Sequence, residues 1–412
     1  MTGTTSGPLP DRRWPRGYRR LLAARVLLRS YFFVPFIVLY ARDIGVSLGT
    51  LLAVEAFFSA LVVIVDVPVG VVADRIGPRQ ALIVGASAEA AAALLLAFTA
   101  HPAVFWSVQP LFALALALTQ GADAGLAGAL LREGGRPERF ELAERILQSS
   151  SLGWNAAVFA LASLLSLKGF ATTFLATAVV QSIAVMLLCT LPDARASFAD
   201  AADRLTPRTW LRHLRAALRQ SRSLRLDLLA MVLTGTAFSV LLYLVPAYLV
   251  ASGIDEHLTG AATAVISLAA AGVGCLLPGS WNLRITVVLA AAGALLFVLP
   301  YAAAALAAGV LVQAGQARLL PRFRAQVMAD LGGWGEASAM SVVTTTAGVG
   351  LAALAPVLGL LTDTLRPPGL AVLCTVLLLG AGFTMTERLH RGDRPEAAAR
   401  AEAERMTAEE AA

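Results

Sequence analysis

Apolar runs of about 20 residues, the length a helix needs to cross a bilayer, follow one another along most of the chain and are separated by short polar breaks. The pattern predicts an all-α polytopic membrane protein with twelve transmembrane helices. The predicted spans are 21–41, 48–72, 80–99, 103–131, 144–167, 170–191, 226–250, 258–278, 285–300, 302–320, 337–361 and 370–386.

The longest internal polar stretch divides these spans into six and six. Tyr40 precedes Gly45 by five residues after the first span, and Tyr248 precedes Gly253 by five after the seventh. This shared spacing fits a parallel repeat of two pseudo-symmetric six-helix bundles. The predicted organisation is a cytoplasmic tail at 1–20, a bundle at 21–191, a cytoplasmic loop at 192–225, a bundle at 226–386 and a cytoplasmic tail at 387–412.

Positive charge lies mainly on one side of this topology. With the N-terminus inside, 28 of the 33 Lys and Arg residues fall in inner segments, and only Arg42, Lys168 and Arg366 fall in outer loops. Because cytoplasmic loops of membrane proteins are enriched in these residues, we expect both termini in the cytoplasm and the protein in the cell membrane.

Composition agrees with this class and argues against others. Hydrophobic residues make up 58% of the chain and charged residues 15%, with a mean hydropathy of +0.72; soluble domains average about 45–50% and about 25%. The net charge of +6 could suggest nucleic-acid binding, but the basic residues flank apolar runs, where they orient the protein in the bilayer. The sequence has no phosphate-binding loop or metal-ligand cluster, so we expect neither an enzyme nor a cofactor.

The loop after the second span carries a motif. Residues 66–79 read Asp-Val-Pro-Val-Gly-Val-Val-Ala-Asp-Arg-Ile-Gly-Pro-Arg, which resembles the G-x-x-x-D-R-x-G-R-R signature of the major facilitator superfamily. Pro78 and Gln80 stand where that signature is usually basic. The acid-x-Pro-x-Gly at 66–70 and the Gly-Ala-Asp-Ala at 121–124 resemble one branch of the superfamily, whereas Ala117 replaces an arginine common in its drug–proton antiporters.

The resemblance implies that two bundles rock about a central site and that this loop is a conformational latch. Gly70 would let two helices approach closely, and Gly77 would permit a tight reversal with positive φ. Asp74 would accept hydrogen bonds from a facing helix N-terminus or an arginine, and Arg75 and Arg79 would pair with inner-leaflet lipid or acidic side chains. The alternative is a generic charged turn that maintains topology.

Ionisable residues within membrane spans are costly and usually face a partner or a cavity. Arg29 lies in the first span, and Phe32, Phe36 and Tyr40 follow it at helical spacing, which predicts a stripe along one helix face. Arg29, which could contact an anionic or aromatic group of the substrate, is a candidate substrate-binding residue. Tyr40 is another. The alternative is a structural ion pair of Arg29 with Asp66 or Asp123.

Carboxyl groups in the second and third spans are candidate proton carriers. Glu55 and Asp66 are eleven residues apart and share one helix face; Glu55 could instead be wet at the outer surface, and Asp66 could belong to the latch. Glu89 lies midway along the third span, which is peripheral in the superfamily fold. A carboxylate facing lipid is costly, so we expect Glu89 to point inward or to be protonated.

Further candidates lie in the fourth span, which the resemblance places beside the cavity, and in the tenth. Gln120 and Asp123 are neighbours on a helix, and Gln109 shares a face with Gln120. Gln313 and Gln316 in the tenth span are candidates for the same substrate- or proton-binding role.

These observations favour a secondary active transporter. We expect a monomer that exports a small, moderately hydrophobic molecule in exchange for protons. Its expected partners are the small-molecule substrate, the proton and membrane lipids, with no nucleic acid. The alternatives are proton-coupled uptake of a small metabolite and a non-transporting sensor or scaffold with the same fold.

Overall fold

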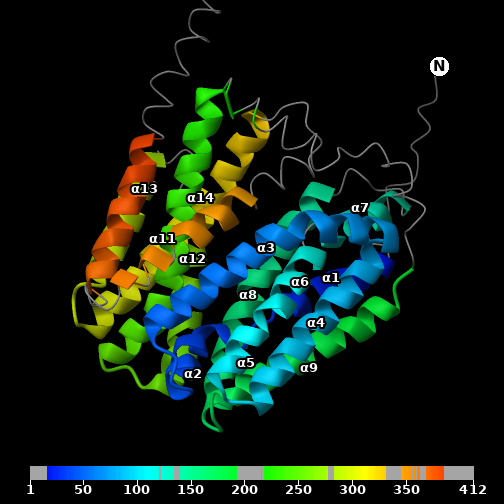
Figure 1. Cartoon of the computed structure of the whole chain (residues 1–412), viewed down its shortest axis with the longest axis horizontal. Coiled ribbons are helices and arrows are strands. Elements are labelled where there is room, and N and C mark those ends of the chain that lie inside the picture. Colours follow the sequence, from blue (N-terminus) through cyan, green and yellow to red (C-terminus); the bar gives the residue numbers. More distant parts are fainter. Residues whose placement is uncertain are drawn as a thin grey trace, which may run out of the picture.

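The computed structural model describes residues 16–119, 122–133, 140–192, 221–276, 283–330 and 368–384, together with 345–361 except 355, 359, and the isolated positions 215, 218 and 219. These residues form helices and short connections, and no strand occurs among them (Figure 1). Seven helices are long and apolar enough to cross a membrane, and four shorter apolar helices accompany them. The all-α membrane class is therefore confirmed, while the number twelve stays a prediction.

Most helices correspond to the predicted spans. In the first half the elements are α1 (Arg16–Leu28), η1 (Val34–Phe36), α2 (Ile37–Asp43), α3 (Leu48–Ile76), α4 (Pro78–Phe98), α5 (Pro102–Ser107), α6 (Gln109–Thr119), α7 (Ala122–Glu133), α8 (Phe140–Ser166) and α9 (Ala171–Cys189). In the second half they are α11 (Arg222–Ala251), η4 (Glu256–Leu258), α12 (Thr259–Leu276), α13 (Leu283–Leu296) and α14 (Ala302–Asp330), followed by the apolar helices Thr345–Leu358 and Pro368–Thr384.

Two predicted spans are not single helices. The run at 103–131 is divided into α5 and α6 at Val108, with residues 120–121 before α7 outside the described residues, and the run at 21–41 is covered by α1, η1 and α2. In the first span the helix stops at Leu28 and resumes as α2 at Ile37. Pro35 lies in this interval and is disfavoured within a helix, because it lacks an N–H and its ring clashes with the preceding turn. The predicted stripe from Arg29 to Tyr40 is therefore wrong, since no continuous helix carries it.

The turns after α2 and α11 have the same structure at positions 208 residues apart. Gly45 and Gly253 both have positive φ, at 80° and 94°. Val46 N donates to Ala41 O at 2.8 Å, and Ile254 N donates to Leu249 O at 3.0 Å. Such a bond closes a helix end whose glycine adopts the left-handed conformation. The shared Tyr-to-Gly spacing thus corresponds to one local structure used twice.

The first half has two apolar cores. Near α2 and α5 the core is aromatic, with Phe33 and Phe174 stacked at 4.7 Å between ring centroids. Toward α7 a second core contains Leu21, Leu82 and Leu126, all fully buried. The interruption of the first span lies between these two cores, and polar side chains gather there.

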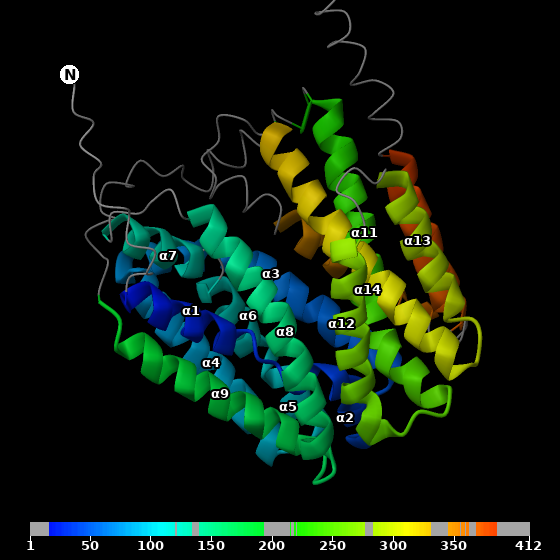
Figure 2. The same ribbon diagram turned by 180° about the vertical axis from the view of Figure 1, so that it is seen from behind.

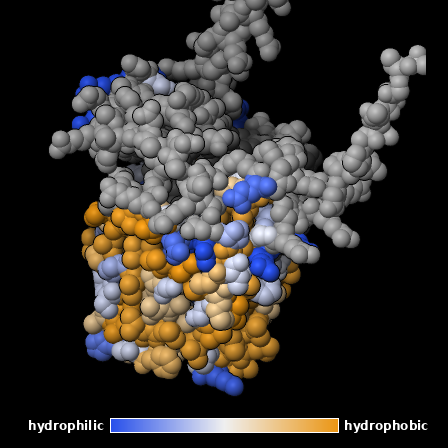
Figure 3. All heavy atoms as spheres, turned by 90° about the vertical axis from the view of Figure 1, so that its right-hand side faces the viewer, coloured by the Kyte–Doolittle hydropathy of each residue, from blue (hydrophilic) through white to orange (hydrophobic). Residues whose placement is uncertain are grey.

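The two halves lie side by side, and their helices diverge from the end that carries α2 and η4 (the α2 end) toward the end that carries α7 and the start of α11 (the α7 end; Figures 1 and 2). Apolar side chains dominate the visible outer surface of the described residues (Figure 3). Large apolar residues elsewhere in the described part, such as Leu164 and Phe383, are 64% and 71% exposed, which fits contact with lipid.

Candidate functional site

Side chains from α9 hold the interruption of the first span. Phe32 N donates to Thr177 Oγ1 at 3.1 Å, and Gln181 Nε2 donates to Leu28 O at 3.1 Å. Thr177 and Gln181 are one helical turn apart and fully buried. Breaking a helix leaves backbone donors and acceptors without their usual partners, and these two side chains satisfy one of each. The interruption is therefore stabilised by side chains of another helix.

Glu89 of α4 lies at the same level. Its side chain is buried, and its Oε1 accepts a hydrogen bond of 3.0 Å from the same Gln181 Nε2. Tyr31, within the interruption, lies near Glu89. The expectation that Glu89 points inward agrees with this arrangement, in which α4, α9 and the first span share one polar cluster.

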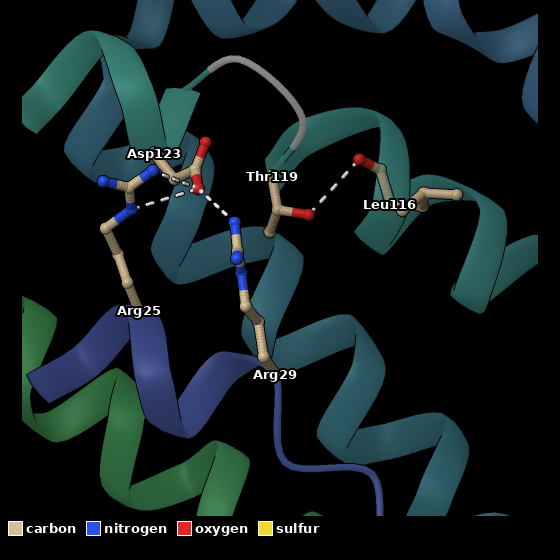
Figure 4. A network of polar contacts seen from close by, with 5 residues as sticks. All are labelled: Arg25, Arg29, Leu116, Thr119 and Asp123. Carbon is tan, nitrogen blue, oxygen red and sulfur yellow. Dashed lines mark hydrogen bonds and ion pairs between the residues drawn. The ribbon is translucent and has the colours of Figure 1, made fainter. Parts of the chain in front are cut away.

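A second cluster joins the first span to α7 (Figure 4). Asp123 Oδ2 accepts hydrogen bonds from Arg25 Nε at 3.1 Å and Arg25 Nη2 at 2.9 Å, and it lies 3.7 Å from Arg29 Nη2. The Arg25 side chain is 1% exposed, whereas that of Arg29 is 37% exposed. Thr119, also shown, bonds to carbonyls of its own helix. Of the two expected partners of Arg29, the structure brings Asp123 within ion-pair distance.

One carboxyl group connects the two halves. The Tyr243 hydroxyl of α11 donates a hydrogen bond to Glu55 Oε2 of α3. Glu55 is seven residues into α3, about 10 Å from its start at 1.5 Å per residue. Both side chains belong to partly buried residues, so Glu55 contacts the other half instead of lying free in water.

Further polar contacts between the halves lie at the α2 end. Arg42 Nη2 is 2.6 Å from Glu256 Oε2, Ser166 Oγ is 3.2 Å from His257 Nδ1, and Ala261 N donates to Ser163 Oγ at 2.7 Å. These three contacts and the Tyr243–Glu55 hydrogen bond join described residues of the two halves. Val63 of α3 and Gly348 of Thr345–Leu358 make a deeper apolar contact.

The motif loop is described in part. Gly77 separates α3 from α4 with φ of 89°, as the tight reversal requires. Arg79 Nε and Nη2 donate to Leu188 O at 3.1 Å and Cys189 O at 2.7 Å, where a positive charge is favoured at a helix C-terminus, and its pairing with lipid stays a prediction. The surroundings of Gly70 and the side chains of Asp74 and Arg75 lie outside the described part of the structure.

The remaining candidates are dispersed. Tyr40 is buried in the aromatic core and donates to Leu96 O at 2.8 Å, and Gln109 donates to Phe105 O at 2.8 Å within its own segment. Asp66 is partly buried on α3, and Gln313 and Gln316 are partly buried on α14. Gln120 lies outside the described residues.

Sequence reasoning missed Arg25, Tyr31, Gln181 and Tyr243 as candidates. A charge within an apolar run could have selected Arg25, which lies one turn before Arg29. The amide of Gln181 stands in an apolar run and gave a weaker signal. Tyrosines are common in apolar runs, so the partners of Tyr31 and Tyr243 became visible only in three dimensions.

Fold and polar contacts together define a multi-pass helical membrane protein whose two halves meet at Glu55 and at the α2 end. A profile of the Major Facilitator Superfamily matches residues 24–332, and the chain belongs to this family. Membership of this family supports a secondary transporter rather than an enzyme.

Solved structures with the same fold are transporters of different small molecules. The nucleoside transporter NupG is 16% identical with a TM-score of 0.69, covering 90% of this chain and 97% of its own. The peptide transporter POT in complex with sulfate is 15% identical with a TM-score of 0.69, covering 93% and 96%. A D-xylose-proton symporter is 14% identical with a TM-score of 0.63, covering 88% and 96%. No curated protein sequence matches the chain.

Proposed function

We propose that the chain exports a small, moderately hydrophobic molecule across the cell membrane by alternating access, driven by inward movement of protons. The observation that carries this proposal is the hydrogen bond from Tyr243 to Glu55, which places a carboxyl group between the two halves. Burying a charged carboxylate is far more costly than burying a neutral acid. Protonation of Glu55 therefore favours closing the α2 end over it, and loss of the proton favours opening.

Export is proposed because, among the described residues, polar side chains gather around Glu89 and Asp123 in otherwise apolar surroundings, which suits a substrate with a small polar part and a larger apolar part. Uptake is the second candidate, because one similar structure is a proton symporter by name. Under the predicted topology the α2 end faces outward, so Glu55 would load protons from outside in either direction of substrate transport.

The test uses the full chain in liposomes with an imposed pH gradient, a pH-sensitive dye inside, and a panel of amphiphilic cations, organic acids and neutral aromatic compounds. We expect at least one compound to drive proton movement, with at least a tenfold loss of that movement in Glu55→Gln. Silence across the panel would favour the scaffold alternative, and unchanged movement in Glu55→Gln would remove Glu55 from the mechanism. Cells producing the protein should accumulate less of an active compound if it exports, and more if it imports.

A further inference from the structure

Glu89 is connected to both sides of the interruption in the first span. Through Gln181 Nε2, which donates to both Glu89 Oε1 and Leu28 O, it is linked to the end of α1. On the other side of the interruption Tyr31 lies near Glu89, and Thr177, one turn before Gln181, accepts a hydrogen bond from Phe32 N. The hydrogen bonds of one buried carboxyl group thus influence the conformation of the first span where its helix is broken.

The other atom of the Gln181 amide indicates which form of Glu89 fits. Gln181 Oε1 is buried and has no hydrogen-bond partner among the described residues. A carboxylate is only an acceptor, so it cannot satisfy an amide oxygen, whereas a protonated acid has one O–H to donate. A neutral Glu89 can donate to Gln181 Oε1 and accept from Gln181 Nε2 at once. Because buried polar atoms are nearly always paired, this arrangement accommodates a proton on Glu89.

The neighbouring elements contribute few charges. Helices α5, α6 and α9 contain no charged residue. Asp123 of α7 is bonded to Arg25, and Arg79, at the start of α4, is bonded to the end of α9. The positive charge of Arg29 lies close enough to Tyr31 to interact with it electrostatically. The charged residues of α3 are Glu55, Asp66, Asp74 and Arg75.

We propose that Glu89 is a proton-binding site, and that its protonation controls the interruption of the first span and thereby the contact of Arg29 with Asp123. The proposal rests on proton coupling as the proposed function. The proton comes from water at the interruption, where Tyr31 is half-buried, converts the carboxylate to the acid, and returns by the same route. As a carboxylate, Glu89 accepts from Gln181 Nε2; as an acid it also donates to Gln181 Oε1, which changes the position of the amide that holds Leu28 O and so that of the backbone beside Arg29.

The test is infrared difference spectroscopy of the reconstituted full chain between acid and alkaline pH, which needs no substrate. We expect a carbonyl band of a protonated carboxyl group that is lost in Glu89→Gln and moves to higher wavenumber in Gln181→Leu, because the acid loses its amide partner. Glu89→Asp, which keeps an acid, should retain a displaced band, so the test survives if the glutamine variant misfolds. An unchanged band in Glu89→Gln and in Glu89→Asp would overturn the site.

Transport separates this inference from the proposed function. If the wild type couples substrate to protons and Glu89→Gln keeps the same proton-to-substrate ratio, the role of Glu89 is overturned and proton-coupled transport stands. If the wild type moves no protons while the band still depends on Glu89, the proposed function fails and the proton site stands.

Discussion

At the scale of single residues, two ion pairs with similar distances have different surroundings. Arg25 and Asp123 are 2.9 Å apart with side chains 1% and 20% exposed, whereas Arg42 and Glu256 are 2.6 Å apart with side chains 57% and 38% exposed. A buried charge that loses its partner is strongly destabilising, but an exposed pair contributes little. The two pairs should therefore respond differently to loss of the acid.

Asp123→Asn is expected to lower the stability of the protein by about 3 kcal/mol, because it leaves the buried Arg25 guanidinium without its carboxylate. Glu256→Gln is the matched control and should cost less than about 1 kcal/mol. Thermal unfolding in detergent measures both. Equal shifts of Tm in the two variants would contradict the assignment of Arg25–Asp123 as a buried structural pair.

The sequence indicates which charged residues are unusual, but it does not indicate which residues they contact. Glu89, Arg29 and Asp123 stand out because a charge in an apolar run is unusual, and the alternative that Arg29 pairs with Asp123 agrees with the 3.7 Å between them. The link from Glu89 to Gln181 joins residues 92 positions apart, and nothing in a single sequence reports such a contact. The same limit applies to Tyr243 and Glu55, which lie in different halves.

At the scale of elements, hydropathy located the spans but not their interruptions. An apolar run records how much of a segment suits lipid, and it does not record whether the helix is continuous. Pro35 was a local signal for the break in the first span. The polar partners that stabilise the break, Thr177 and Gln181, lie in α9, so its position depends on tertiary structure.

The contact of α8 with α12 depends on a residue without a side chain. A Cβ atom on Gly260 would lie 2.5 Å from Phe159 O and 2.7 Å from Ser163 Oγ, whereas one on Gly272 of the same helix would meet nothing within 4 Å. Gly260→Ala should therefore push the halves apart at the α2 end, and Gly272→Ala should not.

Maleimide labelling of Ser166→Cys, with the native cysteines replaced, measures this separation, because Ser166 is fully buried beside His257 of the other half. We expect labelling to become several-fold faster in Gly260→Ala. Equal rates in the two alanine variants would show that this close approach does not hold the α2 end closed.

At the scale of the whole molecule, two halves with one repeated turn are joined by polar contacts at the α2 end. The turns at Gly45 and Gly253 and the contacts Arg42–Glu256 and Ser166–His257 lie at this end. Such a distribution suits a protein that exchanges contacts at one end for contacts at the other around a fixed centre. The proposed function requires that one end of the molecule opens while the other closes.

Pulsed electron paramagnetic resonance tests this claim most directly, with spin labels at Lys168 and Ala251 across the α2 end and at Glu133 and Arg225 across the α7 end, all four exposed. Between acid and neutral pH, and on addition of an active compound, we expect one distance to lengthen while the other shortens. Single distances that stay unchanged at both ends under every condition would contradict alternating access and favour a static scaffold.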